Sequence, residues 1–322
     1  MFLSRKQILL VTILAHIIIP LILLFGFFLY GGESMADTLL YVLFAGSVVA
    51  LLYKASFWEF TWFYGRYLLV LIFLIMAVLC IALKLSAAIT FDVRNWMMDT
   101  IFLWLSVFCM MYLAGAFVAS KKPKNFLELA FPFKEGSYII TDGGDGKISA
   151  LMNYHNKSQV HKKGQANTSM RFATDIAKIS KFGFTVENLL TEKNDDYQIF
   201  GETLYSPCEA KVFKIVNEMD DNVPFSQKFP YNVGNCVVLR KNNNYIVMGH
   251  LERNSITVKE GQSVKTGQIL GVVGNSGLTP RPHLHMQVSQ SNNGLYWEGE
   301  GVAIVFNKTI YPYKNKVIKV KG

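Results

Sequence analysis

The stretch that decides the fold of the second half of this chain is VKEGQSVKTGQILGVVGNSGLTPRPHLHMQV, residues 258–288. Its first part places short apolar runs between glycines, and we expect Gly261, Gly267 and Gly271 to lie at tight turns around short strands. This pattern is typical of a barrel-sandwich type of fold.

The end of that stretch carries two histidines in a strand-like run, His283-Leu284-His285, followed by Met286-Gln287-Val288. Because successive side chains of a strand point to opposite faces, the two imidazoles share one face, and the apolar residues between and after them pack against the other. Two imidazoles on a rigid strand suit a metal ligand beside a second ligand or a catalytic base. An isolated pair of this kind can equally be two exposed polar residues on a half-solvated strand.

The rest of the second half is also rich in short strand signals. From residue 121 onward, β-branched and aromatic runs are separated by Gly, Asn and Asp, and these runs are 138–141, 211–216, 236–240, 245–250, 269–273, 283–288 and 302–306. Several short strands at this spacing predict an antiparallel sheet or a small barrel. We therefore expect an all-β domain over residues 137–322, preceded by a linker at 121–136.

The first 120 residues have a different composition, because most of the apolar side chains are crowded there. A helix that crosses a hydrocarbon core of about 30 Å needs roughly 20 apolar residues. Four segments approach this length, and they are 8–30, 36–53, 67–83 and 97–119. The first is too long for the apolar core of a cleavable signal peptide and is interpreted as an uncleaved span. We expect residues 1–120 to form a transmembrane helical domain in contact with membrane lipid.

The basic flanks of this domain and the number of its spans both bear on its orientation in the membrane. Arg5 and Lys6 precede the first span and three lysines follow the last, and basic flanks favour the cytoplasm. Four spans with both ends inside would place the second half in the cytosol, whereas three or five would place it outside. The net charge of +9 also lies almost wholly in the second half, where it would attract anionic lipid, nucleic acid or an anionic wall polymer.

Two further sets of residues have ordinary structural interpretations. His16 interrupts the first span and is expected to face a neighbouring helix rather than to have a function. Cys208 and Cys236 each lie beside a strand-like run, so they can form a disulfide or a packed pair of thiols.

The second half resembles the lysostaphin-like, or LytM-type, zinc peptidases in the order of its motifs. The matching segments are Asn153-Tyr154-His155, RFATDI at 171–176, SPCEAKV at 206–212, MGHL at 248–251 and His283-Leu284-His285. The resemblance covers roughly residues 137–310. Ala210 departs from the family pattern, which generally has a glycine in the turn before that strand.

The resemblance implies a set of metal ligands and catalytic residues. His155, Asp175 and His285 would bind one Zn²⁺, and His250 and His283 would act as base and transition-state stabiliser. Three protein ligands leave an open position for water, whose pKa the metal lowers to roughly 7.

One spacing departs from the family pattern and leaves a rival for the first ligand. Nineteen residues separate His155 from Asp175, where the family usually has three, so a loop must be inserted between them. His161 lies in that insertion and is the rival to His155.

The implied function is a membrane-anchored metalloendopeptidase that hydrolyses the peptide part of peptidoglycan, with an extracytoplasmic catalytic domain and no nucleic-acid partner. A second hypothesis is a cytoplasmic-facing barrel-sandwich carrier or phosphocarrier, because such domains share the glycine-bounded hairpins and agree with four spans. A third is a non-catalytic scaffold relative. The retention of every candidate ligand and both candidate bases argues against the third.

Overall fold

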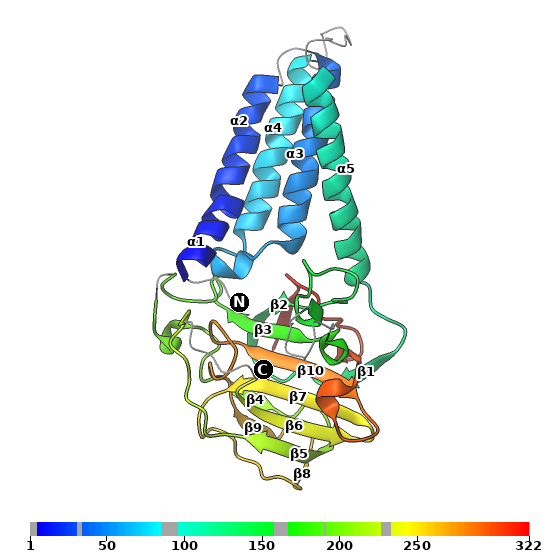
Figure 1. Ribbon diagram of the computed structural model, residues 1–322. Helices are drawn as coiled ribbons and strands as arrows, with labels where there is room; N and C mark the ends of the chain where they lie inside the picture. The colour runs from blue at the N-terminus through cyan, green and yellow to red at the C-terminus, as the bar shows by residue number, and fades with distance from the viewer. Residues whose placement is uncertain are drawn as a thin grey trace. The chain divides into compact units, whose positions relative to one another are not determined.

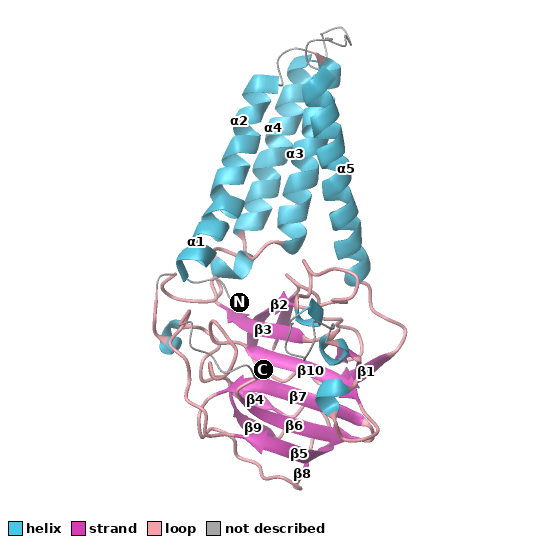
Figure 2. Cartoon of the chain, in the orientation of Figure 1, coloured by secondary structure: helices cyan, strands magenta, loops and turns pink. Residues whose placement is uncertain are grey.

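The computed structural model describes residues 5–30, 34–84, 96–157, 167–189, 191–226 and 233–321. The chain divides into two compact units, a helical one over Lys6–Phe117 and a second one that begins at Val118. Figure 1 follows the chain through the two units, and Figure 2 shows that helices make up the first and strands dominate the second.

The helical unit contains four long apolar segments in the described part of the chain. Their helices are α1 (Arg5–Ile13), continued by a π-helical turn (Leu14–Ile18) into α2 (Ile19–Tyr30), then α3 (Met35–Ala55), α4 (Gly65–Lys84) and α5 (Trp96–Ala119). Residues 10–29, 35–55, 65–83 and 96–119 are long and apolar enough to cross a membrane. The four predicted helices are therefore confirmed, with ends within two residues of the expected ones for the last three.

His16 lies in the π-helical turn and contacts the segment that connects α3 to α4. Its ring stacks on Trp58 with the ring centres 3.9 Å apart, and its nitrogens lie 2.7 Å from the Ser56 hydroxyl and 3.0 Å from the Thr61 hydroxyl. A polar side chain in an apolar span is thereby satisfied within the protein, as the packing interpretation of His16 expects.

The second unit is built on one large, mainly antiparallel sheet. Its nine strands follow the order β13-β2-β3-β10-β7-β6-β5-β8, and β11 pairs with β10 beside that path. The bounds are β2 (Gly136–Asp142), β3 (Thr174–Ile179), β5 (Ala210–Val216), β6 (Asn235–Lys241), β7 (Asn244–Leu251), β8 (Ser263–Val264), β10 (Leu284–Gln290), β11 (Glu300–Gly301) and β13 (Val317–Val320).

Two small two-stranded sheets accompany the large one. The strands β4 (Thr203–Tyr205) and β9 (Ile269–Val272) pair antiparallel, whereas β1 (Phe126–Leu129) and β12 (Ala303–Phe306) pair parallel. Side chains of all four strands join those of one face of the large sheet in the main apolar core. The expected all-β fold is thus a large sheet with two small ladders packed on one face.

Two local expectations are wrong. The segment 121–136 is not simply a linker, because Leu129 of β1 is 2% exposed and, with Phe131 and Phe133, belongs to the core. Gly271 is not at a turn but within β9, where a Cβ would lie only 3.3 Å from the Ile256 Cα, so close backbone approach explains the glycine. Gly261 and Gly267 do have the positive φ angles expected of turn glycines.

The alternation of side chains along β10 separates the core from the opposite face of the sheet. Leu284, Met286 and Val288 are buried in the main core. His285 and Gln287 therefore point to the other face, where His285 lies directly opposite Asp175 of β3. This confirms the predicted burial of the apolar residues in the HxH strand and places its polar residues together.

The two cysteines of the β-rich unit do not form the disulfide that the sequence left open. Both are buried free thiols in the described part of the chain, and they belong to different apolar clusters. Cys208 packs in the main core, whereas Cys236 packs beside Tyr245 and Tyr296.

These thiols are expected to be unreactive in the folded protein. Burial raises the pKa of Cys208, and it raises the pKa of Cys236 to about 11, so little thiolate is present at pH 8. Titration of thiols at pH 8 without reductant should find neither cysteine reactive in the native protein and both reactive after denaturation. A mass two hydrogens lower than that of the reduced chain would instead reveal a disulfide.

Candidate metal centre

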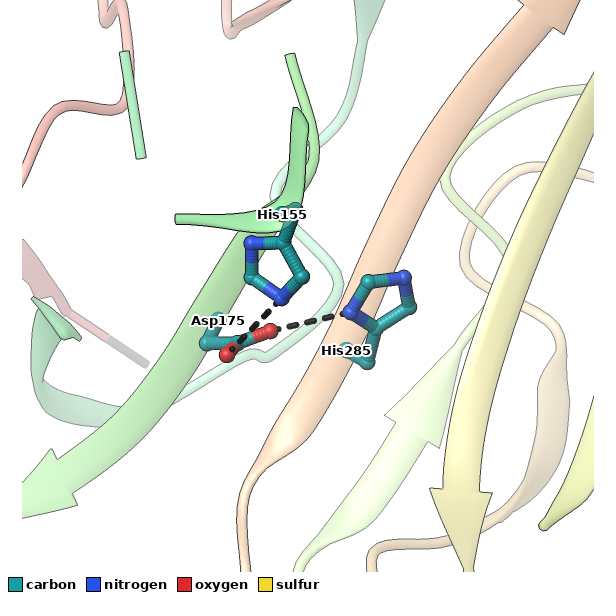
Figure 3. Close-up of side chains that lie close together, drawn as sticks. All are labelled: His155, Asp175 and His285. Carbon is teal, nitrogen blue, oxygen red and sulfur yellow. Dashed lines mark hydrogen bonds and ion pairs between the residues drawn. The ribbon is translucent and has the colours of Figure 1, made fainter. Parts of the chain in front are cut away.

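The Asp175 carboxylate is the centre of a cluster of imidazoles. Its Oδ2 lies 3.2 Å from the His155 Nε2 and 3.4 Å from the His283 Nε2, and its Oδ1 lies 3.0 Å from the His285 Nδ1. Figure 3 shows the His155 and His285 rings converging on this carboxylate from two sides. One ligand atom from each of His155, Asp175 and His285 fits within a span of 4.8 Å, which is the size of a metal-binding set.

The sheet fixes two of these three residues. Asp175 on β3 and His285 on β10 are direct partners in the antiparallel register, and β7 pairs with the other edge of β10, where Gly249 lies opposite His285. Strands flanked on both sides hold their side chains in narrow ranges of position. The carboxylate and the imidazole are therefore preorganised before any ligand arrives.

His155 reaches the site from a short 3-10 turn, His155–Lys157, and Asn153 fixes that turn. The Asn153 side chain is fully buried, and its amide nitrogen donates to the carbonyls of Gly144, Arg171 and Ala173 at 2.9, 3.2 and 2.9 Å. The segment before His155 is thus tied to the residues that lead into β3. This contact explains how His155, which nineteen residues separate from Asp175 in sequence, lies beside it in space.

His161, the rival to His155, lies outside the described residues. Among those described, His155 is the histidine that accompanies Asp175 and His285 in a possible metal-binding group.

The ionisation of the cluster is governed by burial and by the central carboxylate. Burial raises the pKa of Asp175, but the facing imidazoles of His155 and His283 outweigh it and hold this pKa well below its ordinary value. Burial lowers the pKa of His155, but the Asp175 carboxylate outweighs this effect and raises that pKa to about 9. Burial dominates at His285 and lowers its pKa. The carboxylate is therefore ionised and ready to bind a cation.

His250 lies near the end of β7 in a backbone conformation that non-glycine residues rarely adopt, with φ at 63°. Its N–H donates to the Val233 carbonyl at 2.7 Å, and its carbonyl accepts from the Gly274 N–H at 2.9 Å. The ring Nδ1 lies 2.8 Å from the Ser276 carbonyl, which can only accept, so Nδ1 carries the proton. The Nε2 of His250 therefore presents a lone pair.

His283 is oriented in the same way. Its Nδ1 lies 2.9 Å from the Arg281 carbonyl, so this nitrogen too carries a proton, and its Nε2 faces Asp175. The His250 and His283 ring centres are 4.7 Å apart. Burial, with the neighbouring His283 and His285, holds the pKa of His250 well below its ordinary value, so this ring is neutral at pH 7.

Three polar residues of the site were given no role from the sequence. Asn153 and Gln287 each accept a hydrogen bond from a ring nitrogen of a candidate ligand, at 3.0 Å from His155 Nδ1 and 3.0 Å from His285 Nε2. Each is two residues from the histidine that it contacts, and this spacing was the available signal. Asp142 accepts a hydrogen bond from the Tyr154 N–H at 3.1 Å, and burial raises the pKa of Asp142 to about 6.

Comparison with known proteins identifies the β-rich unit. A family model described as peptidase family M23 matches residues 200–297. Residues 200–297 of this chain belong to a peptidase family M23 domain. The matched residues of the M23 domain include His250, His283 and His285, whereas His155 and Asp175 precede them.

Two curated relatives of the M23 domain have informative names. An uncharacterised metalloprotease of Buchnera aphidicola subsp. Baizongia pistaciae is 32% identical over 109 residues, which are 34% of this chain and 27% of that protein. The peptidoglycan DD-endopeptidase ShyA of Vibrio cholerae is 39% identical over 69 residues, which are 21% of this chain and 16% of that protein. The chain thus spans less than a third of the length of these relatives.

Solved structures with similarity to this chain include a zinc-containing peptidase from Vibrio cholerae, with a TM-score of 0.30 and 23% identity, covering 51% of this chain and 36% of that one. The lysostaphin catalytic domain from Staphylococcus simulans has a TM-score of 0.25 and 21% identity, covering 37% of this chain and 86% of that one.

The donor set formed by His155, Asp175 and His285 fits a zinc ion. Two imidazoles and one carboxylate are ligands that zinc accepts in tetrahedral sites, and three protein ligands leave a position for water. The second nitrogen of each imidazole is already committed to an amide oxygen, as is usual for metal-binding histidines.

We expect the purified protein to bind one Zn²⁺ per chain. Replacing His155, Asp175 or His285 with alanine should abolish stoichiometric binding, because each removes one of three ligands, whereas His161→Ala should leave it intact. Metal content after gel filtration, measured by mass spectrometry of the element, checks this. Loss of zinc in His161→Ala with retention in His155→Ala would exchange the two assignments.

Proposed function

We propose that this protein is a membrane-anchored zinc metalloendopeptidase that hydrolyses peptide bonds in the peptide part of peptidoglycan. The observation that carries this proposal is the convergence of His155, Asp175 and His285 with two further imidazoles, His250 and His283, whose Nδ1 atoms are each held by a backbone carbonyl. Histidines that only pack in the structure would not need three rings around one carboxylate and a fourth ring beside them.

His155, Asp175 and His285 would hold the metal through Nε2, a carboxylate oxygen and Nδ1, the atoms that face one another. When bound, zinc lowers the pKa of a coordinated water to about 7 and polarises the scissile carbonyl. The sheet positions Asp175 and His285, and the Asn153 contacts position His155, so little reorganisation accompanies the reaction.

His250 and His283 supply proton transfer. Each donates its Nδ1–H to a backbone carbonyl, so each can accept a proton at Nε2 from the attacking water. Once protonated, the same nitrogen can return the proton to the leaving amine or donate to the developing oxyanion. His250 is the better initial acceptor, because His283 Nε2 already lies beside Asp175.

The substrate class is supported by the relatives that share the M23 domain, one of which is named a peptidoglycan DD-endopeptidase. Peptidoglycan lies outside the cytoplasm, so the proposal places the catalytic domain there. Because four spans put both ends of the helical unit on the same side of a membrane, the amino terminus would be extracytoplasmic as well. The basic residues Arg5 and Lys6 would then be on the unusual side.

The carrier hypothesis explains less of the site. A carrier or phosphocarrier domain has no use for Asp175 and four converging imidazoles, whereas metal-assisted hydrolysis assigns a task to each of the five side chains.

Alanine at His250 or His283 should lower the turnover of cross-linked muropeptides by about a hundredfold or more, because general acid–base catalysis contributes that much. Zinc content should stay near wild type, since neither residue is among the three proposed ligands. Quantifying products by liquid chromatography and mass spectrometry checks the rate. Full activity in both variants would remove these histidines from the mechanism.

The location of the catalytic domain can be tested with introduced cysteines, Lys321→Cys or Ser4→Cys, each in a Cys208→Ala, Cys236→Ala background. We expect a membrane-impermeant thiol reagent to label both before cell lysis, and the background protein to remain unlabelled. Labelling of both only after lysis would exclude peptidoglycan as a direct substrate. Labelling of only one before lysis would contradict the even number of spans.

A further inference from the structure

We propose that Gln287 is a positioning residue that selects the tautomer of His285 able to bind the metal. This inference rests on the proposed zinc peptidase function and concerns a residue with no part in the ligand set. The Gln287 side chain is fully buried on the same face of β10 as His285, two residues further along the strand. Its Oε1 lies 3.0 Å from the His285 Nε2.

The need for such a residue follows from the two partners of the His285 ring. Nδ1 lies 3.0 Å from the Asp175 carboxylate, and Nε2 lies 3.0 Å from the Gln287 oxygen. A neutral imidazole has one proton for these two positions. With the proton on Nδ1, the ring donates to Asp175 and its metal-facing nitrogen is blocked. With the proton on Nε2, the ring donates to Gln287 and Nδ1 is free to bind the metal.

The corresponding contact at His155 is held differently. The Asn153 amide nitrogen donates to three backbone carbonyls, so its oxygen can face only His155, and His155 must donate from Nδ1. This leaves His155 Nε2 for the metal. The nitrogen left for the metal is therefore Nε2 in His155 and Nδ1 in His285. In each ring, an amide oxygen two residues away accepts the proton of the other nitrogen.

Gln287 has no comparable anchor. Its amide nitrogen is buried and has no hydrogen-bond partner among the described residues. A buried amide N–H₂ without a partner destabilises the fold, so an apolar residue of similar size would suit this position better if packing alone decided it. The retained amide is explained by the acceptor that its oxygen offers to His285.

Two substitutions separate positioning from packing. In Gln287→Met the side chain keeps its length but loses the acceptor, and we expect zinc affinity to fall about 10- to 100-fold, as for other residues that orient metal ligands. In Gln287→Glu the carboxylate can accept but not donate, so the Nε2–H tautomer is retained and zinc affinity should equal or exceed that of the wild type. Ser289→Ala is the matched control, because Ser289 is the next buried residue on the same face and donates to the Tyr296 carbonyl.

The measurement is the zinc dissociation constant of the full chain in detergent, from competition with a chromophoric chelator, beside the melting temperature of the metal-free protein. The proposal predicts weak binding in Gln287→Met, restored binding in Gln287→Glu and unchanged binding in Ser289→Ala. Wild-type affinity in Gln287→Met, or equally weak binding in both Gln287 variants, would overturn it. An absence of zinc binding by the wild type would instead overturn the proposed function.

Discussion

The charge of Asp175 is the constraint on which the rest of the catalytic unit depends. A carboxylate with 14% of its side chain exposed can stay ionised only if opposite charge or hydrogen-bond donors replace the water that it loses. Three imidazoles surround it here, one from the turn at His155 and two from positions 283 and 285 at the start of β10. The sheet register, the Asn153 contacts and the loop before β10 each place one of those rings. A metal ion would satisfy the same charge more strongly than the imidazoles do.

The chemistry of the site is divided between two faces of one strand. Leu284, Met286 and Val288 bury one face of β10 in the main core, and that packing holds His285 and Gln287 on the other. Alternate residues of β10 thus stabilise the core and form the candidate site. His250 adds a conformational constraint, because its positive φ is maintained by hydrogen bonds on both sides of the residue. The strained backbone of His250 is explained by the direction in which it points the imidazole ring.

Much of this could be predicted from sequence because the signals were local. The spans follow from apolar length, and the two faces of β10 follow from alternation over six residues. What could not be predicted depends on distant contacts. β1 lies in a segment that was expected to be a linker and pairs with β12, some 177 positions later for Phe126 and Ala303. Gly271 resembles a turn glycine but is needed for close backbone approach. The cysteine pair was ambiguous because each flanking strand contributes to a different cluster.

The site itself was only partly visible in the sequence. The HxH pair was clear, whereas the amide partners Asn153 and Gln287 resemble ordinary polar residues until the rings that they contact are placed. The central claim is that this cluster performs zinc-dependent hydrolysis of peptidoglycan peptides. The most direct test is mass spectrometry of a defined cross-linked muropeptide incubated with the full chain, first with a zinc chelator and then after zinc is restored. The account predicts no cleavage with the chelator and, with zinc, two products whose masses sum to the substrate plus one water. Cleavage that persists without zinc, or none with zinc bound, would contradict it.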